Sequence, residues 1–146
     1  MRLVWGLDEV VGDYISAHFP ELTALRVLRP HVAVGFVSNQ NQLVGGLALN
    51  FENVFEGTLS ICTDSRHCLT PRMLRELFHW AFVERRLARL TCQVAKRNKR
   101  ARRLVIGLGF KMEGTKRKGF DGRRDCVVYG MTIETCRWLV DRNEST

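Results

Sequence analysis

Apolar side chains recur at helical spacing in two parts of the chain. Residues 8–19 show the pattern weakly, and residues 70–86 show it strongly. Thr70 and Pro71 open the second segment, where they suit an N-cap and a first helical position. Two helices are therefore expected, the second ending near residue 86.

Apolar runs and alternating patterns predict six strands, bounded by short polar turns. These strands cover residues 31–37, 43–51, 58–63, 90–95, 111–118 and 126–133. Asn98 is expected to cap a third helix that ends near Gly107 or Gly109. A helical turn is expected through Trp138.

The element order is helix, three strands, helix, strand, helix, two strands. It predicts an α+β fold with a central mixed sheet that is mostly antiparallel. The strands at 58–63 and 90–95 are joined by a helix, so they are expected to be parallel neighbours. The length of 146 residues suits one domain spanning 1–146.

Composition excludes several classes of protein. Apolar residues make up 45% and charged residues 26%, which excludes a disordered, collagen-like or coiled-coil chain. No apolar run approaches the roughly 20 residues of a membrane span, and the first residues do not resemble a signal peptide. The five cysteines lack zinc-ligand spacing. We therefore expect a cytoplasmic protein with reduced thiols and no metal site.

Charge is distributed unevenly. Residues 85–124 hold 15 of the 23 Lys and Arg residues but only two acids, Glu113 and Asp121. Such a basic segment attracts an anionic partner: a nucleic acid, an acidic protein or a phosphate-bearing cofactor. A solvated helix face with no partner would show the same composition.

The element order and the residues after Thr70 resemble the GCN5-related N-acetyltransferase (GNAT) superfamily. The similarity is greatest to ribosomal-protein N-terminal acetyltransferases and their phage-borne relatives. It is carried by residues 78–82, by the strand 90–95 followed by Asn98, by residues 108–114 with Arg117, and by residues 125–131.

This resemblance implies acetyl-CoA as co-substrate, with its pantetheine held where strands 58–63 and 90–95 splay apart. The pyrophosphate would lie at the N-terminus of the helix that begins at Pro71, where the helix dipole favours an anion. The implied cofactor-binding residues are Ile61, Cys62, Thr63, Arg66, Thr70, Arg72, Met73, Asn98, Arg102 and Arg103.

Three departures from the superfamily pattern concern the cofactor and the leaving thiolate. The glycine positions of the phosphate loop fall on His67, Leu69 and Pro71. Val105 stands where a tyrosine often protonates the thiolate, and Ala101 stands where the terminal-acetylating branch often has serine.

Acid–base chemistry needs a base for the attacking amine and a proton for the leaving thiolate. The candidate bases are the carboxylates of Glu52, Glu56, Glu113 and Asp125. The thiolate proton could come from water, Cys62, Cys68 or Tyr129. Asp125, Glu52 and Tyr129 are the catalytic candidates.

The sequence thus predicts an N-acetyltransferase that transfers acetyl from acetyl-CoA to a primary amine of a protein or small molecule. The expected mechanism is direct attack in a ternary complex, because no cysteine has an identifiable paired base. The alternatives are a catalytically silent binding module with this fold and a basic nucleic-acid-binding protein. Contact with nucleic acid or the ribosome would use the basic half. A monomer and a homodimer both fit.

Overall fold

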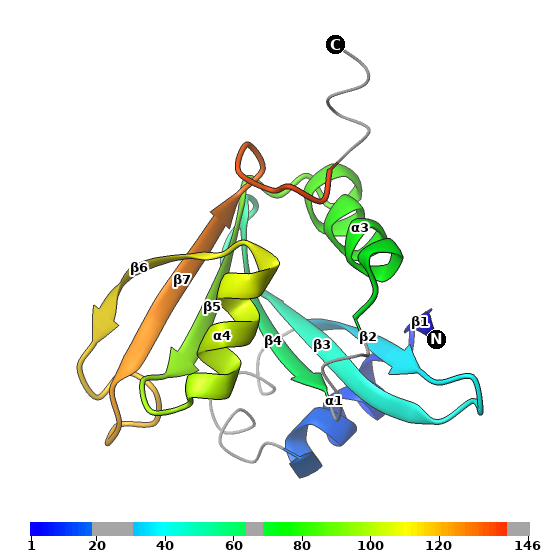
Figure 1. Cartoon of the computed structure of the whole chain (residues 1–146), viewed down its shortest axis with the longest axis horizontal. Coiled ribbons are helices and arrows are strands. Elements are labelled where there is room, and N and C mark those ends of the chain that lie inside the picture. Colours follow the sequence, from blue (N-terminus) through cyan, green and yellow to red (C-terminus); the bar gives the residue numbers. More distant parts are fainter. Residues whose placement is uncertain (19–30, 64–68, 140–146) are drawn as a thin grey trace. The chain divides into compact units, whose positions relative to one another are not determined.

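The computed structural model describes residues 1–18, 31–63 and 69–139 (Figure 1). The chain divides into two compact units, which are treated separately below. Unit 1 contains residues 1–51 and 59–73, and unit 2 contains residues 52–58 and those from 74 onward. The expectation of one domain over 1–146 stays a prediction.

Seven strands form a mixed sheet in the order β1-β2-β3-β4-β5-β7-β6, with one parallel pair. The pairs β1–β2, β2–β3, β5–β7 and β6–β7 are antiparallel. The predicted α+β class and the neighbouring positions of β4 and β5 are therefore confirmed. The strands are β1 (Arg2–Trp5), β2 (His31–Val37), β3 (Leu43–Phe51), β4 (Glu56–Thr63), β5 (Arg89–Ala95), β6 (Lys111–Lys116) and β7 (Cys126–Thr132).

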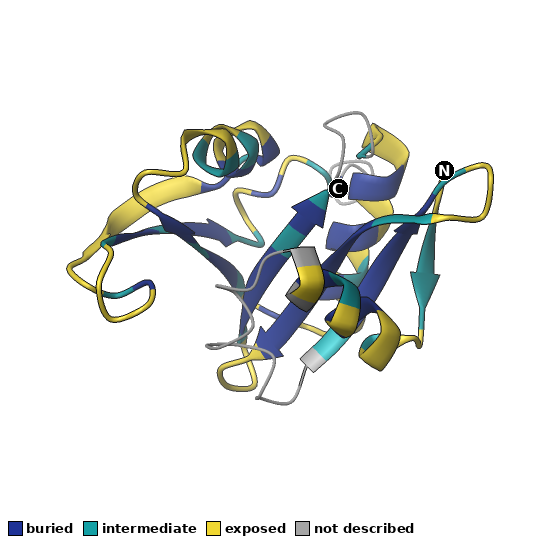
Figure 2. Ribbon diagram, turned by 90° about the horizontal axis from the view of Figure 1, so that it is seen from below, coloured by how far each residue is buried: buried dark blue, intermediate teal, exposed yellow. Residues whose placement is uncertain are grey.

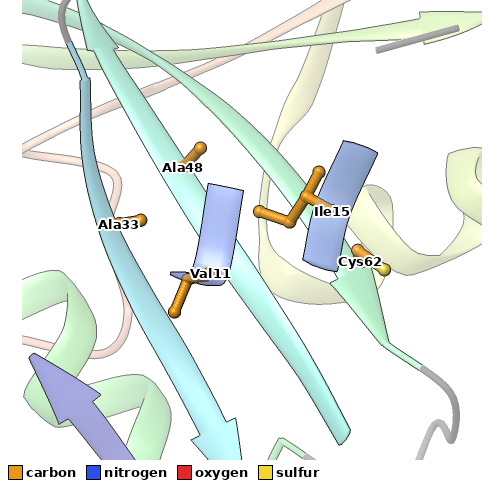
Figure 3. Packing of buried hydrophobic residues seen from close by; sticks show 5 residues of the cluster. All are labelled: Val11, Ile15, Ala33, Ala48 and Cys62. Atoms are coloured by element: carbon orange, nitrogen blue, oxygen red, sulfur yellow. The ribbon is translucent and has the colours of Figure 1, made fainter. Parts of the chain in front are cut away.

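Unit 1 is built around α1 (Asp8–His18), which packs on β2 and β3. Val11 and Ile15 on the helix are fully buried against Ala33, Ala48 and Cys62 on the strands (Figure 3). Small residues on the strands let the helix approach closely, so this core is held by dispersion contacts between small and branched side chains.

Unit 2 contains most of α3 (Pro71–His79), the π-helix η2 (Trp80–Glu84), β5, α4 (Lys99–Leu108), β6 and β7. Its aromatic core joins the ring of Phe78 to those of Phe82 and Phe110, each with a centroid separation of 6.3 Å. Every residue of β6 is exposed (Figure 2).

The helix that begins at Pro71 differs from its prediction only at its end. Thr70 caps it as expected, with its hydroxyl oxygen accepting the Met73 backbone N–H at 3.2 Å. The α-helical pattern stops at His79 and continues as η2, where Arg85 N donates to the Trp80 carbonyl, five residues earlier, at 2.9 Å. Apolar spacing could not show this change of hydrogen-bond partner.

α4 agrees with its predicted limits. The side-chain oxygen of Asn98 accepts the Ala101 backbone N–H at 3.1 Å, which makes Asn98 the N-cap. Gly109 ends the helix in the left-handed conformation, with φ +106°. Both ends of α4 could be predicted from the sequence because each depends on one local residue.

Two parts of the expected architecture were wrong. β1 was not foreseen, because four residues carry too short a pattern. The segment through Trp138 forms hydrogen-bonded turns and no helix. Its indole N–H donates to the Leu108 carbonyl at 2.8 Å, so a long-range contact fixes this segment.

No helix within residues 1–18, 31–63 and 69–139 is long and apolar enough to cross a membrane. The same residues contain no group of three or more His, Cys, Asp or Glu side chains placed to hold a metal ion. The four cysteines described, Cys62, Cys92, Cys126 and Cys136, are buried and are not in disulfides.

Close packing of β3 on β4 makes Gly45 a sensitive position in unit 1. A Cβ at Gly45 would lie 2.6 Å from the Cys62 carbonyl oxygen and 3.1 Å from the Thr63 Cα, neither of which can rotate away. We expect Gly45→Ala to lower the free energy of unfolding in urea by about 1–3 kcal/mol.

Gly107→Ala is the matched control, because nothing lies within 4 Å of the added Cβ. Alanine favours a helix, so this variant should be unchanged or stabilised by up to about 1 kcal/mol. Equal stability of the Gly45→Ala variant and the wild type would contradict the close approach of β3 and β4.

Candidate functional site

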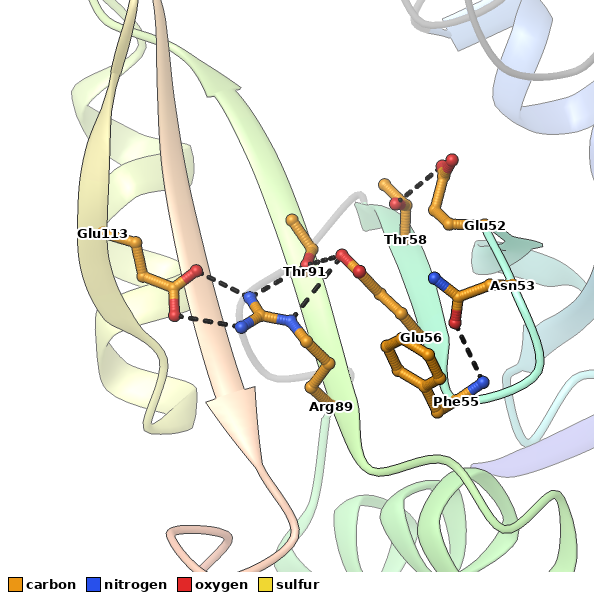
Figure 4. A network of polar contacts seen from close by, with 8 residues as sticks. All are labelled: Glu52, Asn53, Phe55, Glu56, Thr58, Arg89, Thr91 and Glu113. Atoms are coloured by element: carbon orange, nitrogen blue, oxygen red, sulfur yellow. Dashed lines mark hydrogen bonds and ion pairs between the residues drawn. The ribbon is translucent and has the colours of Figure 1, made fainter.

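Arg89 stands at the centre of a polar network in unit 2 (Figure 4). Its Nη2 donates to Glu113 Oε1 at 2.6 Å and its Nη1 to Glu113 Oε2 at 3.4 Å. Its Nε lies 3.6 Å from Glu56 Oε2, close enough for charge attraction but too far for a hydrogen bond. One guanidinium therefore forms ion pairs with two carboxylates on different strands, β4 and β6.

Glu113 reaches Arg89 by passing over β7. A register shift between Met112 and Gly114 leaves Glu113 without a partner residue in β7. Its carboxylate lies over Gly130, where any Cβ would collide with it. Glu113 therefore has a structural role in this network.

Thr91 and Glu56 complete the connection between β5 and β4. The buried Thr91 hydroxyl donates to Glu56 Oε2 at 2.8 Å and accepts Arg89 Nη2 at 3.2 Å. The hydrogen bond to Glu113 raises the pKa of Arg89, an effect that partial burial opposes. The guanidinium is charged at every working pH.

Glu52, a predicted catalytic residue, lies in the turn between β3 and β4. It is exposed, and its Oε1 accepts the Thr58 hydroxyl proton at 3.0 Å. The Phe55 backbone N–H donates to Asn53 Oδ1 at 2.9 Å within the same turn. Glu56 and Glu113 flank Arg89, whereas Glu52 lies on the other side of β4 beside Thr58 (Figure 4). Three carboxylates against one guanidinium leave the network with a net negative charge, which favours a cationic group.

Tyr129 and Arg102, also predicted site residues, are hydrogen-bonded to each other. Tyr129 is fully buried on β7, and its hydroxyl oxygen accepts Arg102 Nε at 2.9 Å. Arg102 Nη1 also donates to the Lys96 carbonyl at 3.2 Å. The Tyr129 hydroxyl keeps its own proton to donate, whereas two of the Arg102 nitrogens are already engaged.

Asp125 closes the connection between β6 and β7. Its Oδ1 accepts the Lys118 backbone N–H at 3.0 Å, and its carbonyl accepts the Lys96 N–H at 3.0 Å. Asp121 shapes the tip of the same loop by accepting the backbone N–H groups of Arg123 and Arg124 and the Arg124 Nε. Both carboxylates thus order the loop from within.

The predicted pantetheine residues lie on β4 in unit 1. Cys62 is buried in the core beneath α1, so its thiol packs against apolar side chains. Ile61 and Thr63 flank it in sequence and are half-buried. Because side chains alternate along a strand, these two point to the face opposite the Cys62 side chain.

The residues at the start of α3 that could bind phosphate differ in whether they have a backbone N–H available to donate. Pro71 has no N–H, and the Met73 N–H is bonded to Thr70. Within the described part of the first turn, Arg72 keeps a backbone N–H with no bond of its own, and its side chain is exposed. Arg103 is exposed on α4, and Arg66 lies outside the described residues.

Sequence reasoning missed Arg89 and Thr91 as site residues. Both belong to a strand that was predicted correctly, and Arg89 is a charged residue at its first position. Its partner Glu113 lies 24 residues further along the chain. No local signal indicates that pairing, because it depends on the register of β7 between the two strands.

Comparison with known proteins gives a consistent structural class. No protein-family model matches the chain, and no curated protein matches it in sequence. Among solved structures, an alanine mutant of SpeG, the spermidine N-acetyltransferase of Vibrio cholerae, aligns over 100% of both chains with TM-score 0.69 and 16% identity. The chain thus has the fold of the GNAT acetyltransferases.

Further structures give the same result. A chimera of SpeG and hSSAT aligns with TM-score 0.70 and 17% identity, covering 96% of this chain and 99% of that one. A chain from Acinetobacter baylyi assigned as an acetyltransferase aligns with TM-score 0.66 and 18% identity, covering 92% and 93%. For a glycine mutant of SpeG the alignment covers 70% of this chain and 64% of that chain, with TM-score 0.58 and 18% identity.

The pair Arg89–Glu113 can be tested by a double-mutant cycle. Arg89→Gln, Glu113→Gln and the double variant should show a coupling energy of about 0.5–1 kcal/mol in urea unfolding, because both groups are partly exposed. Glu76→Gln is the control, since Glu76 is exposed on α3 and should be additive with Arg89→Gln. A coupling energy near zero for Arg89 and Glu113 would contradict the ion pair.

Asp121 should titrate at unusually low pH. The backbone N–H groups of Arg124 and Arg123, followed by the Arg124 side chain, lower the pKa of its carboxyl from 3.8 to about 2. Because the folded-state pKa is depressed, the stabilisation is complete above pH 4 or so and is lost as pH falls through the folded pKa.

Carbon-detected NMR of the Asp121 carboxyl would measure this midpoint directly. Arg124→Gln removes only the side-chain contribution, so the midpoint should rise part of the way toward 3.8. A wild-type midpoint at the ordinary value would contradict the ordered loop.

Proposed function

We propose that this chain is an acetyl-CoA-dependent N-acetyltransferase acting on a primary amine of a protein or small molecule. The observation that carries the proposal is the alignment over the full length of both chains with a spermidine N-acetyltransferase. The β5–α4 junction supports it, because Asn98 stands at the start of α4 as the resemblance requires.

Acetyl-CoA would supply the acetyl group as a thioester. We propose that backbone groups of residues 61–63 pair with its pantetheine amides. Its phosphates would take the backbone N–H and the guanidinium of Arg72 at the start of α3. Arg66 and Arg103 stay candidates from the sequence. Arg102 is the weaker choice for phosphate, because its guanidinium already bonds Tyr129 and Lys96.

The reaction would proceed by direct attack of the neutral amine on the thioester carbonyl carbon. The new C–N bond forms a tetrahedral oxyanion, whose collapse breaks the C–S bond and releases CoA thiolate. Tyr129 is our candidate to protonate the thiolate, since it accepts from Arg102 and can donate its own proton. Glu52 and Asp125 remain our candidates to take the amine proton.

Of these two carboxylates, Glu52 is the better candidate base. Asp125 orders the β6–β7 loop through the Lys118 N–H, so it has a defined structural role. Glu52 is exposed, its Oε1 accepts the Thr58 hydroxyl, and Glu56 follows four residues along the chain, so the turn between β3 and β4 would attract a cationic amine. Spermidine, the substrate named for SpeG, is therefore a suitable first acceptor, followed by the N-terminus of a ribosomal-protein peptide.

A catalytically silent binding module is the second candidate. It is favoured by the residue type at position 105. Val105 is buried and has no hydroxyl, at the position where the superfamily often has its acid. Pro71 and the bonded Met73 N–H reduce the donors available to phosphate. The cytoplasmic location, the oligomeric state and the phage-borne relationship remain predictions.

Calorimetric titration with acetyl-CoA tests the proposal, with ATP and dephospho-CoA as control ligands. We expect saturable binding near one acetyl-CoA per chain, followed by CoA release when spermidine or a peptide amine is added. Binding without turnover for every amine would favour the silent module. Absence of binding at millimolar acetyl-CoA would reject the transferase proposal and leave the silent module.

Asn98 variants separate its capping role from a cofactor role. Asn98→Ser keeps a capping oxygen but loses the side-chain NH₂ donor, whereas Asn98→Ala loses both. If the amide bonds acetyl-CoA, both variants should bind it about tenfold more weakly. Wild-type affinity in Asn98→Ser would limit Asn98 to capping α4.

A further inference from the structure

Two basic segments of unit 2 carry the whole formal charge of the protein. Residues 96–103 and 117–125, here called the basic cluster, contain ten Lys or Arg and two Asp, a net charge of +8. The remaining residues contain 13 Lys or Arg and 13 Asp or Glu, so they are formally neutral. A protein that needed charge only for solubility would have no reason to concentrate it in this way.

The fold brings these two segments to one end of unit 2. β5 ends at Ala95, which pairs with Cys126 at the start of β7. The next residue, Lys96, donates its N–H to the Asp125 carbonyl at 3.0 Å. The turn that begins α4 and the β6–β7 loop therefore lie side by side at this end (Figure 1).

Contacts within the loop hold its backbone and the side chain of one of its cations, Arg124. Asp121 accepts two backbone N–H groups of the loop, and Asp125 accepts that of Lys118. Arg124 lies over the ring of Phe120, with its guanidinium carbon 5.3 Å from the ring centroid. Both acids are thus used to brace the loop, and its cationic side chains face solvent.

The size of the cluster exceeds what acetyl-CoA requires. Three phosphates can engage a few cations, and the proposed cofactor residues include only Asn98, Arg102 and Arg103 from the cluster. Exposed residues left without a cofactor role are Lys96, Arg97, Lys99, Arg100, Arg117, Lys118, Arg123 and Arg124. A ligand with many regularly spaced negative charges matches this set.

We propose that the basic cluster binds the phosphate backbone of a nucleic-acid duplex. Arginine dominates the cluster, and its planar fork suits phosphate oxygens. Phe120, the single aromatic residue of these segments, is 4% exposed and offers no stacking surface. Single strands are usually bound by stacking on aromatic rings, so a duplex held through its backbone is the better match.

Fluorescence anisotropy with a 20-base-pair RNA duplex tests the proposal, beside a DNA duplex, one RNA strand alone and poly-glutamate. The design uses duplexes of roughly the length that a backbone-reading domain spans. We expect duplex binding with a steep salt dependence and weaker binding of the single strand. Equal RNA and DNA affinities would indicate recognition of the duplex backbone alone, and a preference for RNA would add a contact to its 2′-hydroxyls; both support the proposal.

Arg97→Gln/Arg123→Gln removes one cation from each segment of the cluster. Arg75→Gln/Arg86→Gln removes two exposed cations from elsewhere in the chain and is the matched control. The cluster variant should bind duplex at least about tenfold more weakly at moderate salt, with the slope of log K against log salt reduced by about two. The control should change affinity less than about twofold.

Four results would overturn the proposal, once circular dichroism shows that both variants are folded. They are absence of duplex binding at low salt, binding of poly-glutamate at least as tight as that of duplex, an equal loss in the control variant, and full displacement of duplex by acetyl-CoA. The last would mean that the cluster serves only the cofactor. The proposal does not depend on acetyl transfer, so a failure to bind acetyl-CoA would leave it standing.

Discussion

Arg89, at the first position of β5, makes the contact that links three strands of unit 2 through their side chains. Glu56 on β4 and Glu113 on β6 both direct carboxylates at one guanidinium. β7 lies between β5 and β6, and the missing side chain of Gly130 allows Glu113 to cross it. This salt bridge links two strands that are not neighbours, and it adds a modest stabilisation to the backbone hydrogen bonds that set their register.

The two surfaces for which a function is proposed lie at opposite ends of β5. Arg89 and its carboxylates lie at the end of β5 where the strand begins, and the basic cluster starts where the strand ends. One surface therefore favours cations and the other favours anions, although both belong to the same unit. An amine acceptor and a polyanion would each be attracted to a different end of β5.

Features set by one or two neighbouring residues could be predicted from the sequence. Thr70 and Pro71 begin α3, and Asn98 and Gly109 limit α4, because caps and left-handed ends depend on local chemistry. The same local reasoning failed for the change to a π-helix after His79, where hydrophobic spacing is almost unaffected. Strand register, which decides the site, lay beyond it altogether.

The catalytic candidates show the same limit. Asp125 was selected as a carboxylate at the end of a predicted strand, but its hydrogen bond to Lys118 is visible only in three dimensions. Tyr129 was correctly placed on a strand, yet its pairing with Arg102 joins residues 27 positions apart. The sequence could name residue types suited to acid–base chemistry, and it could not say which of them the fold already uses.

The buried cysteines have a consequence for how the protein opens. Cys62 lies in the core of unit 1, whereas Cys92 and Cys126 lie on paired strands of unit 2. A thiol reagent can modify each of them only during a transient opening that exposes it. Their modification rates would therefore report the opening free energy of each unit from natural side chains, and would reveal whether the two units unfold as one cooperative structure or as two.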